Sequence, residues 1–142
     1  MTGIVSVSEI DIDASAAQVW GILTDSAKLG EVMFGSEVVT DWEVGGPIIY
    51  RGEWEGKPFE DKGTIVEMRE PSLLVVTHYS PLGGDQDVPE NYHEIRYELS
   101  GAGGRTHVAL RQDGNADQAA ADHSATNWDA MLASLKKAAE AS

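Results

Sequence analysis

The stretch NADQAAADHSATNWDAMLASLKKAAEAS, residues 115–142, decides the fold because it predicts one long helix that cannot be stable alone. Asn115 followed three residues later by Gln118 is a helix-start signal, and neither glycine nor proline interrupts the run to about Glu140. The apolar residues of this run share one face, on which lie Trp128, Met131, Leu132, Leu135 and Ala139. At a rise of about 1.5 Å per residue the helix would be roughly 35 to 40 Å long, so its apolar face needs a large partner.

The rest of the chain supplies that partner as a series of strands separated by turn signals. Residues 4–13 alternate like a strand, with one slip of phase suggested in the middle. Two short helices are expected next, the first beginning near Ser15 and the second near Asp25 or Ser26. Further strands are expected at 37–43, 48–55, 63–70, 73–80, 92–100 and 106–112. Short links between consecutive strands imply an antiparallel arrangement.

We therefore predict an α+β fold, in which a curved antiparallel sheet of six or seven strands wraps around the long C-terminal helix. The two short helices follow the first strand. Residues 1–142 are expected to form a single domain, because the chain is long enough for one hydrophobic core and too short for two ordinary ones.

The formal net charge of −14 argues against several classes of partner. Nucleic acid and anionic membranes would repel the chain, whose longest basic cluster is the pair Lys136-Lys137. No apolar run approaches the ~20 residues that span a bilayer, and the start MTGIVSVSEIDID lacks the basic region of a signal peptide. Zero cysteines remove disulfides, thiolate metal sites and cysteine nucleophiles. We expect a cytoplasmic protein without membrane insertion.

Three stretches carry a family resemblance: DWEVGGPIIYRGEW (41–54), GTIVEMREPSLLVVTH (63–78) and IRYELSGAGGRTHVALRQDG (95–114). They resemble the AHSA-type branch of the SRPBCC (START/Bet v-like) superfamily. This branch comprises the homologues of the activator of the Hsp-90 ATPase. The closing helix is similar as well, at NWDAMLASLKKAAE (127–140). The resemblance implies the helix-grip fold, with a cavity between sheet and long helix that accepts hydrophobic or amphipathic small molecules. Members of this superfamily use that cavity for transport, for sensing, or for cyclisation and dehydration.

Alternation along the strands divides the side chains into an inward set and an outward set. His78 is in phase with Leu74, and His93 is in phase with Ile95, so both histidines are expected on the face toward the helix. The candidate ligand-contacting residues are Tyr50, Trp54, His78, His93, Tyr97 and Gln112 on the strands and Asn127, Trp128 and Met131 on the helix, with Met33 and Phe34 at the rim. A mostly apolar cavity with a few polar groups is the usual composition of a small-molecule site. Each of these side chains could equally serve packing, and for Trp128 a core position is the favoured interpretation.

No catalytic residue, cofactor or metal site is assigned from the sequence. A metal held by His78 and His93 would need a third ligand, and no carboxylate is expected in the inward set to provide it. The stretch GAGGR (101–105) joins two strands and opens no helix, which is typical of a hairpin turn rather than a phosphate-binding loop.

Three functions remain open. Binding of a hydrophobic small molecule or lipid ranks first, because the inward set contains no complete catalytic arrangement. The second is an enzyme of the cyclase or dehydratase type, in which His78 or His93 would act as acid or base and Tyr50 or Tyr97 would polarise a carbonyl. Cyclases of the superfamily often place a charged residue in the cavity, and the inward set offers none. The third is a module that contacts a chaperone ATPase, which the sequence does not support, and a homodimer through an exposed strand edge is also open.

Overall fold

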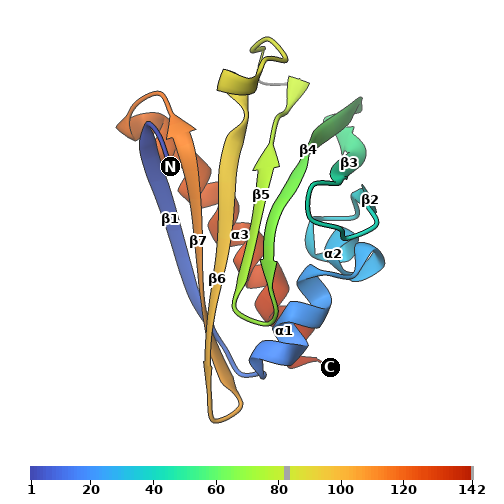
Figure 1. The fold of residues 1–142 in the computed structure, drawn as a ribbon, viewed down its shortest axis with the longest axis vertical. Coiled ribbons are helices and arrows are strands. Elements are labelled where there is room, and N and C mark those ends of the chain that lie inside the picture. The colour runs from blue at the N-terminus through green and yellow to red at the C-terminus, as the bar shows by residue number, and fades with distance from the viewer. Residues whose placement is uncertain (82–83, 142) are drawn as a thin grey trace.

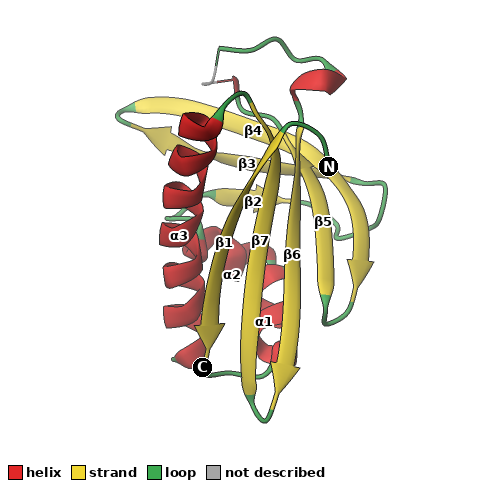
Figure 2. Ribbon diagram, turned by 90° about the vertical axis from the view of Figure 1, so that its left-hand side faces the viewer, coloured by secondary structure: helices red, strands yellow, loops and turns green. Residues whose placement is uncertain are grey.

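The computed structural model describes residues 1–81 and 84–141, apart from the side chain of Trp54. Its strands form one antiparallel sheet in the order β1-β7-β6-β5-β4-β3-β2, and α3 lies against one face of it (Figures 1 and 2). The strands are β1 (Ile4–Ile12), β2 (Glu37–Val39), β3 (Pro47–Trp54), β4 (Lys57–Arg69), β5 (Leu73–His78), β6 (His93–Ala102) and β7 (Arg105–Asn115). The helices are α1 (Ala16–Leu23), α2 (Ser26–Val32), α3 (Gln118–Glu140) and the 3₁₀ turn η2 (Pro89–Asn91). This arrangement confirms the predicted α+β helix-grip fold.

Side-chain caps fix where the helices begin. Ser15 and Gln18 form a capping box at α1, since each side chain accepts a hydrogen bond from the other residue's backbone N–H, at 3.1 and 2.9 Å. The cap of α3 is Asp117, whose Oδ1 accepts from the N–H of Ala120 at 2.8 Å. The predicted cap, Asn115, instead ends β7 and donates its side-chain amide to the carbonyl of Ile4. The helix therefore begins two residues later than its sequence signal indicates.

The first strand carries no slip of phase after Ser6, contrary to the sequence-based prediction. Ser6, Ser8 and Ile12 are buried on the face toward α3, Val7 and Glu9 point outward, and the register shift lies between Ile4 and Ser6. The Ser8 hydroxyl donates to the carbonyl of Ala125 at 3.0 Å, so small polar residues hold α3 close to β1. Figure 2 shows α3 running beside β1 and β7. Because α3 packs mainly beside β1 and β7, space remains between α3 and the strands farther along the sheet.

The strand β4 begins earlier than expected, at Lys57 rather than at residue 63. Glycine and proline at positions 56 and 58 predicted a break, but Glu55 and Gly56 form a two-residue hairpin loop in which both φ angles are positive, at 50° and 78°. Such a loop matches the right-handed twist of the strands and brings Trp54 directly opposite Lys57. Residues 57–62 are thereby added to the sheet.

The apolar face of α3 is buried as its periodicity predicts. Met131, Leu132, Leu135 and Ala139 are each at most 2% exposed, and Trp128 packs against this core while remaining half-buried. No helix among the described residues combines the length and the apolar character that crossing a bilayer requires.

The outer surface of the sheet carries one histidine held between two carboxylates. On β7, His107 places Nδ1 2.8 Å from Asp11 Oδ1 and Nε2 3.1 Å from Glu9 Oε1, both on β1. Both contacts can be hydrogen bonds only when the ring is doubly protonated. The hydrogen bond to Asp11, followed by that to Glu9, therefore raises the pKa of His107 above its ordinary value.

We expect this cluster to make stability depend on pH. Because the folded-state pKa of His107 is raised, its contribution is fully present below the unfolded-state pKa of about 6.5 and is lost as pH rises through the folded-state pKa. The difference in melting temperature between the wild type and His107→Gln should be larger near pH 5.5 than near pH 9. A difference that is the same at both pH values would contradict this assignment.

Candidate functional site

A cavity of about 230 Å³ opens between the sheet and α3, on the side away from β1. Its wall combines aromatic and apolar side chains with a few polar ones: Met33, Phe34, Ser36, Tyr50, Phe59, Asp61, His78, Ile95, Tyr97, Asn127, Trp128 and Met131. Six of the nine candidate ligand-contacting residues are among them, namely Tyr50, His78, Tyr97, Asn127, Trp128 and Met131. Met33 and Phe34, the predicted rim, come from the segment that leaves α2.

Asp61 also lines the cavity, so the expectation that no carboxylate faces inward is wrong. Gly56 and Pro58 indicate a break, so the sequence pattern predicts no strand over residues 57–62 and does not assign Asp61 to the inward set. With β4 starting at Lys57, Asp61 falls in phase with Phe59 and the buried Ile65, and it lies directly opposite Tyr50 of β3. The alternation of Phe59, Asp61 and Ile65 was the signal in the sequence.

Asp61 and His78 form a hydrogen-bonded pair in this wall. The imidazole Nε2 of His78 lies 3.1 Å from Asp61 Oδ2. The His78 side chain is 23% exposed and the Asp61 side chain is 16% exposed. The other oxygen, Asp61 Oδ1, is buried and has no hydrogen-bond partner among the described residues. The Tyr50 ring lies 5.7 Å from the His78 ring at a tilt of 59°. A carboxylate, an imidazole and a phenol thus meet in one corner of the cavity.

A glycine on β4 permits this meeting. A Cβ on Gly63 would lie 1.7 Å from the carbonyl oxygen of Thr77 and 2.5 Å from its carbonyl carbon. No side chain can be accommodated at such distances, so the absence of one lets the end of β5 lie directly against β4. This close approach places His78, the residue after Thr77, within reach of Asp61.

The two tyrosines of the wall stay neutral. Burial is the main cause that raises the pKa of the Tyr50 phenol, followed by the nearby Tyr97 and by the negative charge of Asp61. Burial alone raises the pKa of Tyr97. Both phenols therefore keep their protons at neutral pH and can donate hydrogen bonds to a bound molecule.

Residues 13–140 match the family model described as "Activator of Hsp90 ATPase homolog 1-like protein". The chain belongs to this family. The match spans most of the sequence, including both strands of the Asp61–His78 pair, and agrees with the AHSA-type resemblance found in the sequence. No curated protein matches the chain in sequence.

Solved structures share the fold of this AHSA-type chain. A solution structure from Cytophaga hutchinsonii is 40% identical, with a TM-score of 0.83, over 96% of this chain and 94% of that one. The solution structure of the Aha1 dimer from Colwellia psychrerythraea is 20% identical, with a TM-score of 0.73, over 96% of both chains. An HSP90 activator from Plasmodium falciparum is 16% identical, with a TM-score of 0.69, over 89% of this chain and 88% of that one.

Two residues singled out in the sequence do not line the cavity of this AHSA-type chain, as far as the described side chains define it. His93 turns toward β7, where its Nδ1 lies 2.9 Å from the carbonyl oxygen of Asp113. Gln112 accepts a hydrogen bond of 2.5 Å from the indole Nε1–H of Trp128 and so orients that ring. The side chain of Trp54 lies outside the described residues.

No group of three or more His, Asp or Glu side chains among residues 1–81 and 84–141 is placed to hold a metal ion. His78 and His93 are paired across β5 and β6, yet their rings reach different partners, Asp61 and the backbone of β7. Because Asp61 lines the cavity, a carboxylate does lie near His78. The rings of His78 and His93 nevertheless point to different partners, so Asp61 does not join both of them as a third metal ligand.

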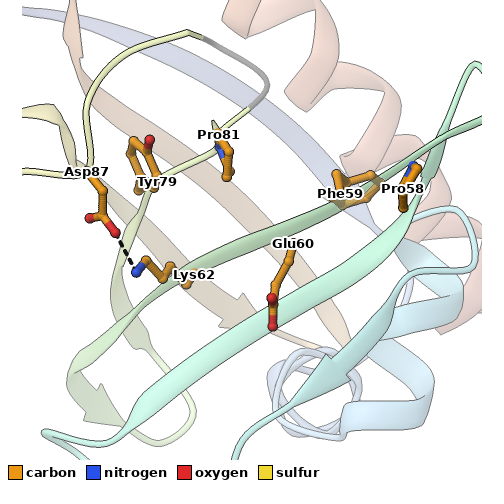
Figure 3. Close-up of a pocket in the computed structure, with 7 residues that line it drawn as sticks. All are labelled: Pro58, Phe59, Glu60, Lys62, Tyr79, Pro81 and Asp87. Atoms are coloured by element: carbon orange, nitrogen blue, oxygen red, sulfur yellow. Dashed lines mark ion pairs between the residues drawn. The ribbon is translucent and has the colours of Figure 1, made fainter.

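A second hollow of about 460 Å³ lies where β4 meets the segment after β5. Figure 3 shows its side chains, in which Lys62 extends toward Asp87; the ion pair measures 2.5 Å. Tyr79 stacks on Tyr92 at 5.2 Å, and the Tyr92 hydroxyl donates to Asp87 at 2.6 Å. These contacts attach the segment that follows β5 to β4. Because its charged groups are already paired, this hollow is a weaker candidate for a ligand site than the cavity under α3.

Proposed function

We propose that this AHSA-type chain binds a small amphipathic molecule in the cavity between the sheet and α3. The observation that supports it is a mostly apolar space of about 230 Å³ in which Asp61, His78 and Tyr50 offer polar groups at one corner. Ligand sites typically combine an apolar wall with a few polar groups that orient the ligand. The volume lies below the ~300 to 1,000 Å³ of drug-sized pockets, which favours a ligand with few atoms.

Native mass spectrometry of the purified protein, followed by denaturing analysis of whatever dissociates, tests this proposal. We expect a stoichiometric excess mass from a small amphipathic compound. A clean apo mass, together with no saturation-transfer NMR signal from small aromatic probes such as phenethyl alcohol, would contradict it. We place this binding in the cytoplasm, an inference that rests on composition alone.

Blocking the mouth of the cavity should weaken binding without unfolding the protein. Asn127 lines the cavity and is exposed, so the indole of Asn127→Trp can occupy the mouth without entering the core. Binding of phenethyl alcohol should weaken by about tenfold or more, because the apolar wall is then occupied. The matched control is Ala130→Trp, which adds the same indole at another exposed position of α3. Equal binding by both variants and the wild type would place the ligand elsewhere.

The Asp61–His78 pair favours a second candidate function, proton-transfer catalysis on the bound molecule. With Nε2–H donated to Asp61, the neutral imidazole keeps Nδ1 as an acceptor for a proton. An orienting carboxylate is what a histidine base requires, and the neutral Tyr50 phenol can donate to a carbonyl oxygen. Asp61 is also the charged cavity residue that the sequence did not reveal.

Deuterium exchange next to the carbonyl of phenylacetone measures this activity directly. His78 would remove the C–H proton, and solvent would return deuterium to the same carbon. We expect exchange above background with the wild type and background exchange with His78→Phe. Background exchange with both proteins would leave binding as the function and exclude catalysis of this class.

A chaperone ATPase or a second copy of the chain is the alternative class of partner. Support comes from similarity to an HSP90 activator and to the Aha1 dimer. Stimulation of the ATPase of a purified Hsp90 homologue would support the chaperone alternative, and sedimentation velocity would detect a dimer. A monomer that leaves that ATPase rate unchanged would exclude both.

A further inference from the structure

Among the described residues that line the cavity, no lysine or arginine stands beside its one carboxylate. Among its twelve lining residues Asp61 is the only acid, none is lysine or arginine, and His78 is the only nitrogen base. Arg51 follows Tyr50 in β3 but lies on the opposite face of that strand, where it pairs with Glu60 at 3.0 Å and Glu37 at 3.6 Å. Among the described lining residues, the one polar contact of the Asp61 carboxylate is therefore its hydrogen bond with His78.

One of the two oxygens of the Asp61 carboxylate also has no hydrogen-bond partner among the described residues. Oδ2 takes the hydrogen bond from His78, whereas Oδ1 is buried without a partner among the described residues. Buried polar atoms are nearly always hydrogen-bonded, and leaving one unpaired costs the free energy of removing it from water. Because the terminal torsion of an aspartate is soft, a small rotation can turn this oxygen toward a ligand that lies in the cavity. Such a partner must be a hydrogen-bond donor.

The surroundings favour a donor that is positively charged and attached to an apolar body. Five of the lining side chains are aromatic, and their faces attract cations: Phe34, Tyr50, Phe59, Tyr97 and Trp128. Ile95 and the methionines of the wall add apolar surface. The formal net charge of −14 attracts cations to the protein and repels anions.

We propose that the ligand is a small apolar amine whose ammonium group pairs with the Asp61 carboxylate while its apolar part lies against Trp128 and Met131. This inference rests on the proposed binding function and deepens it by naming the ligand class. The ammonium supplies the donor that Oδ1 lacks and the charge that the cavity lacks. A charge-assisted hydrogen bond of this kind is about twice as strong as a neutral one.

The test compares three probes that share an aromatic body and differ in the polar end: phenethylamine, phenethyl alcohol and phenylacetate. Their dissociation constants are measured by chemical-shift titration at neutral pH and moderate salt. We expect the amine to bind about tenfold more tightly than the alcohol, and phenylacetate to bind most weakly. In Asp61→Asn the ratio of amine to alcohol affinity should fall to about one.

A matched control separates the cavity carboxylate from general charge attraction. Asp129→Asn removes one negative charge from the exposed face of α3 and should keep the amine preference. Equal loss of the preference in both variants would overturn the assignment to Asp61. Equal binding of amine and alcohol by the wild type would overturn the amine proposal while supporting a ligand-binding cavity. Binding of none of the probes would instead count against the proposed function itself.

Discussion

Gly63→Ala should destabilise the protein by about 3 kcal/mol or more and should separate Asp61 from His78. The added Cβ would lie 1.7 Å from the carbonyl oxygen of Thr77, and its nearest neighbours are all backbone atoms of β5. A flexible side chain could move aside, but a backbone carbonyl cannot move without pulling β5 away from β4. Urea unfolding measures the stability loss, and the NMR signals of the His78 ring report the change in its contact with Asp61.

Gly21→Ala is the matched control for this substitution. Gly21 lies in the exposed part of α1, and a Cβ there would meet no atom within 4 Å apart from its chain neighbours and the backbone of its own helix. Because alanine is the better helix former, this variant should be unchanged or more stable by about 0.5 to 1 kcal/mol. Equal stability of Gly63→Ala and the wild type would show that β5 does not lie against β4 in the described way.

The predictable parts of the fold are those that the chain encodes locally. The burial of Leu132 and Leu135 follows from helical spacing alone, and the capping box at Ser15 needs only four consecutive residues. The first strand shows the limit of this approach. When apolar character alone marks the inward face, the pattern predicts a slip of phase, whereas Ser6 and Ser8 face α3.

The candidate site was only partly predictable because its members depend on contacts between distant residues. Alternation assigns His78 and His93 to one face, but it cannot show where each ring turns. His93 turns toward Gly114, where a Cβ would lie 2.8 Å from its Nδ1, so a glycine on another strand makes room for it. The position of Asp61 is hard to predict for a different reason. Gly56 indicates a turn but does not show that the turn is only two residues long, and this length is what places Asp61 in β4.

Leu135→Ala should cost about 3 to 5 kcal/mol, the upper part of the range for buried leucines. Leu135 is fully buried in the core between α3 and the sheet, so its removal leaves a space that surrounding atoms can only partly fill. Chemical denaturation should show a lower midpoint with an unchanged slope, because the surface exposed on unfolding hardly changes. Leu135→Met, which nearly conserves volume, should lose less than about 1.5 kcal/mol.

Comparison with Met131→Ala turns this stability measurement into a test of the cavity. Met131 is one helical turn before Leu135, on the same buried face, but it borders the empty space under α3. A side chain that faces a void makes fewer contacts, so Met131→Ala should cost less than Leu135→Ala, about 2 kcal/mol. Equal losses would mean that Met131 is packed on all sides and that the cavity is filled in solution. A smaller loss at Met131 would mean that α3 covers an open space, which is the condition on which binding at Asp61 depends.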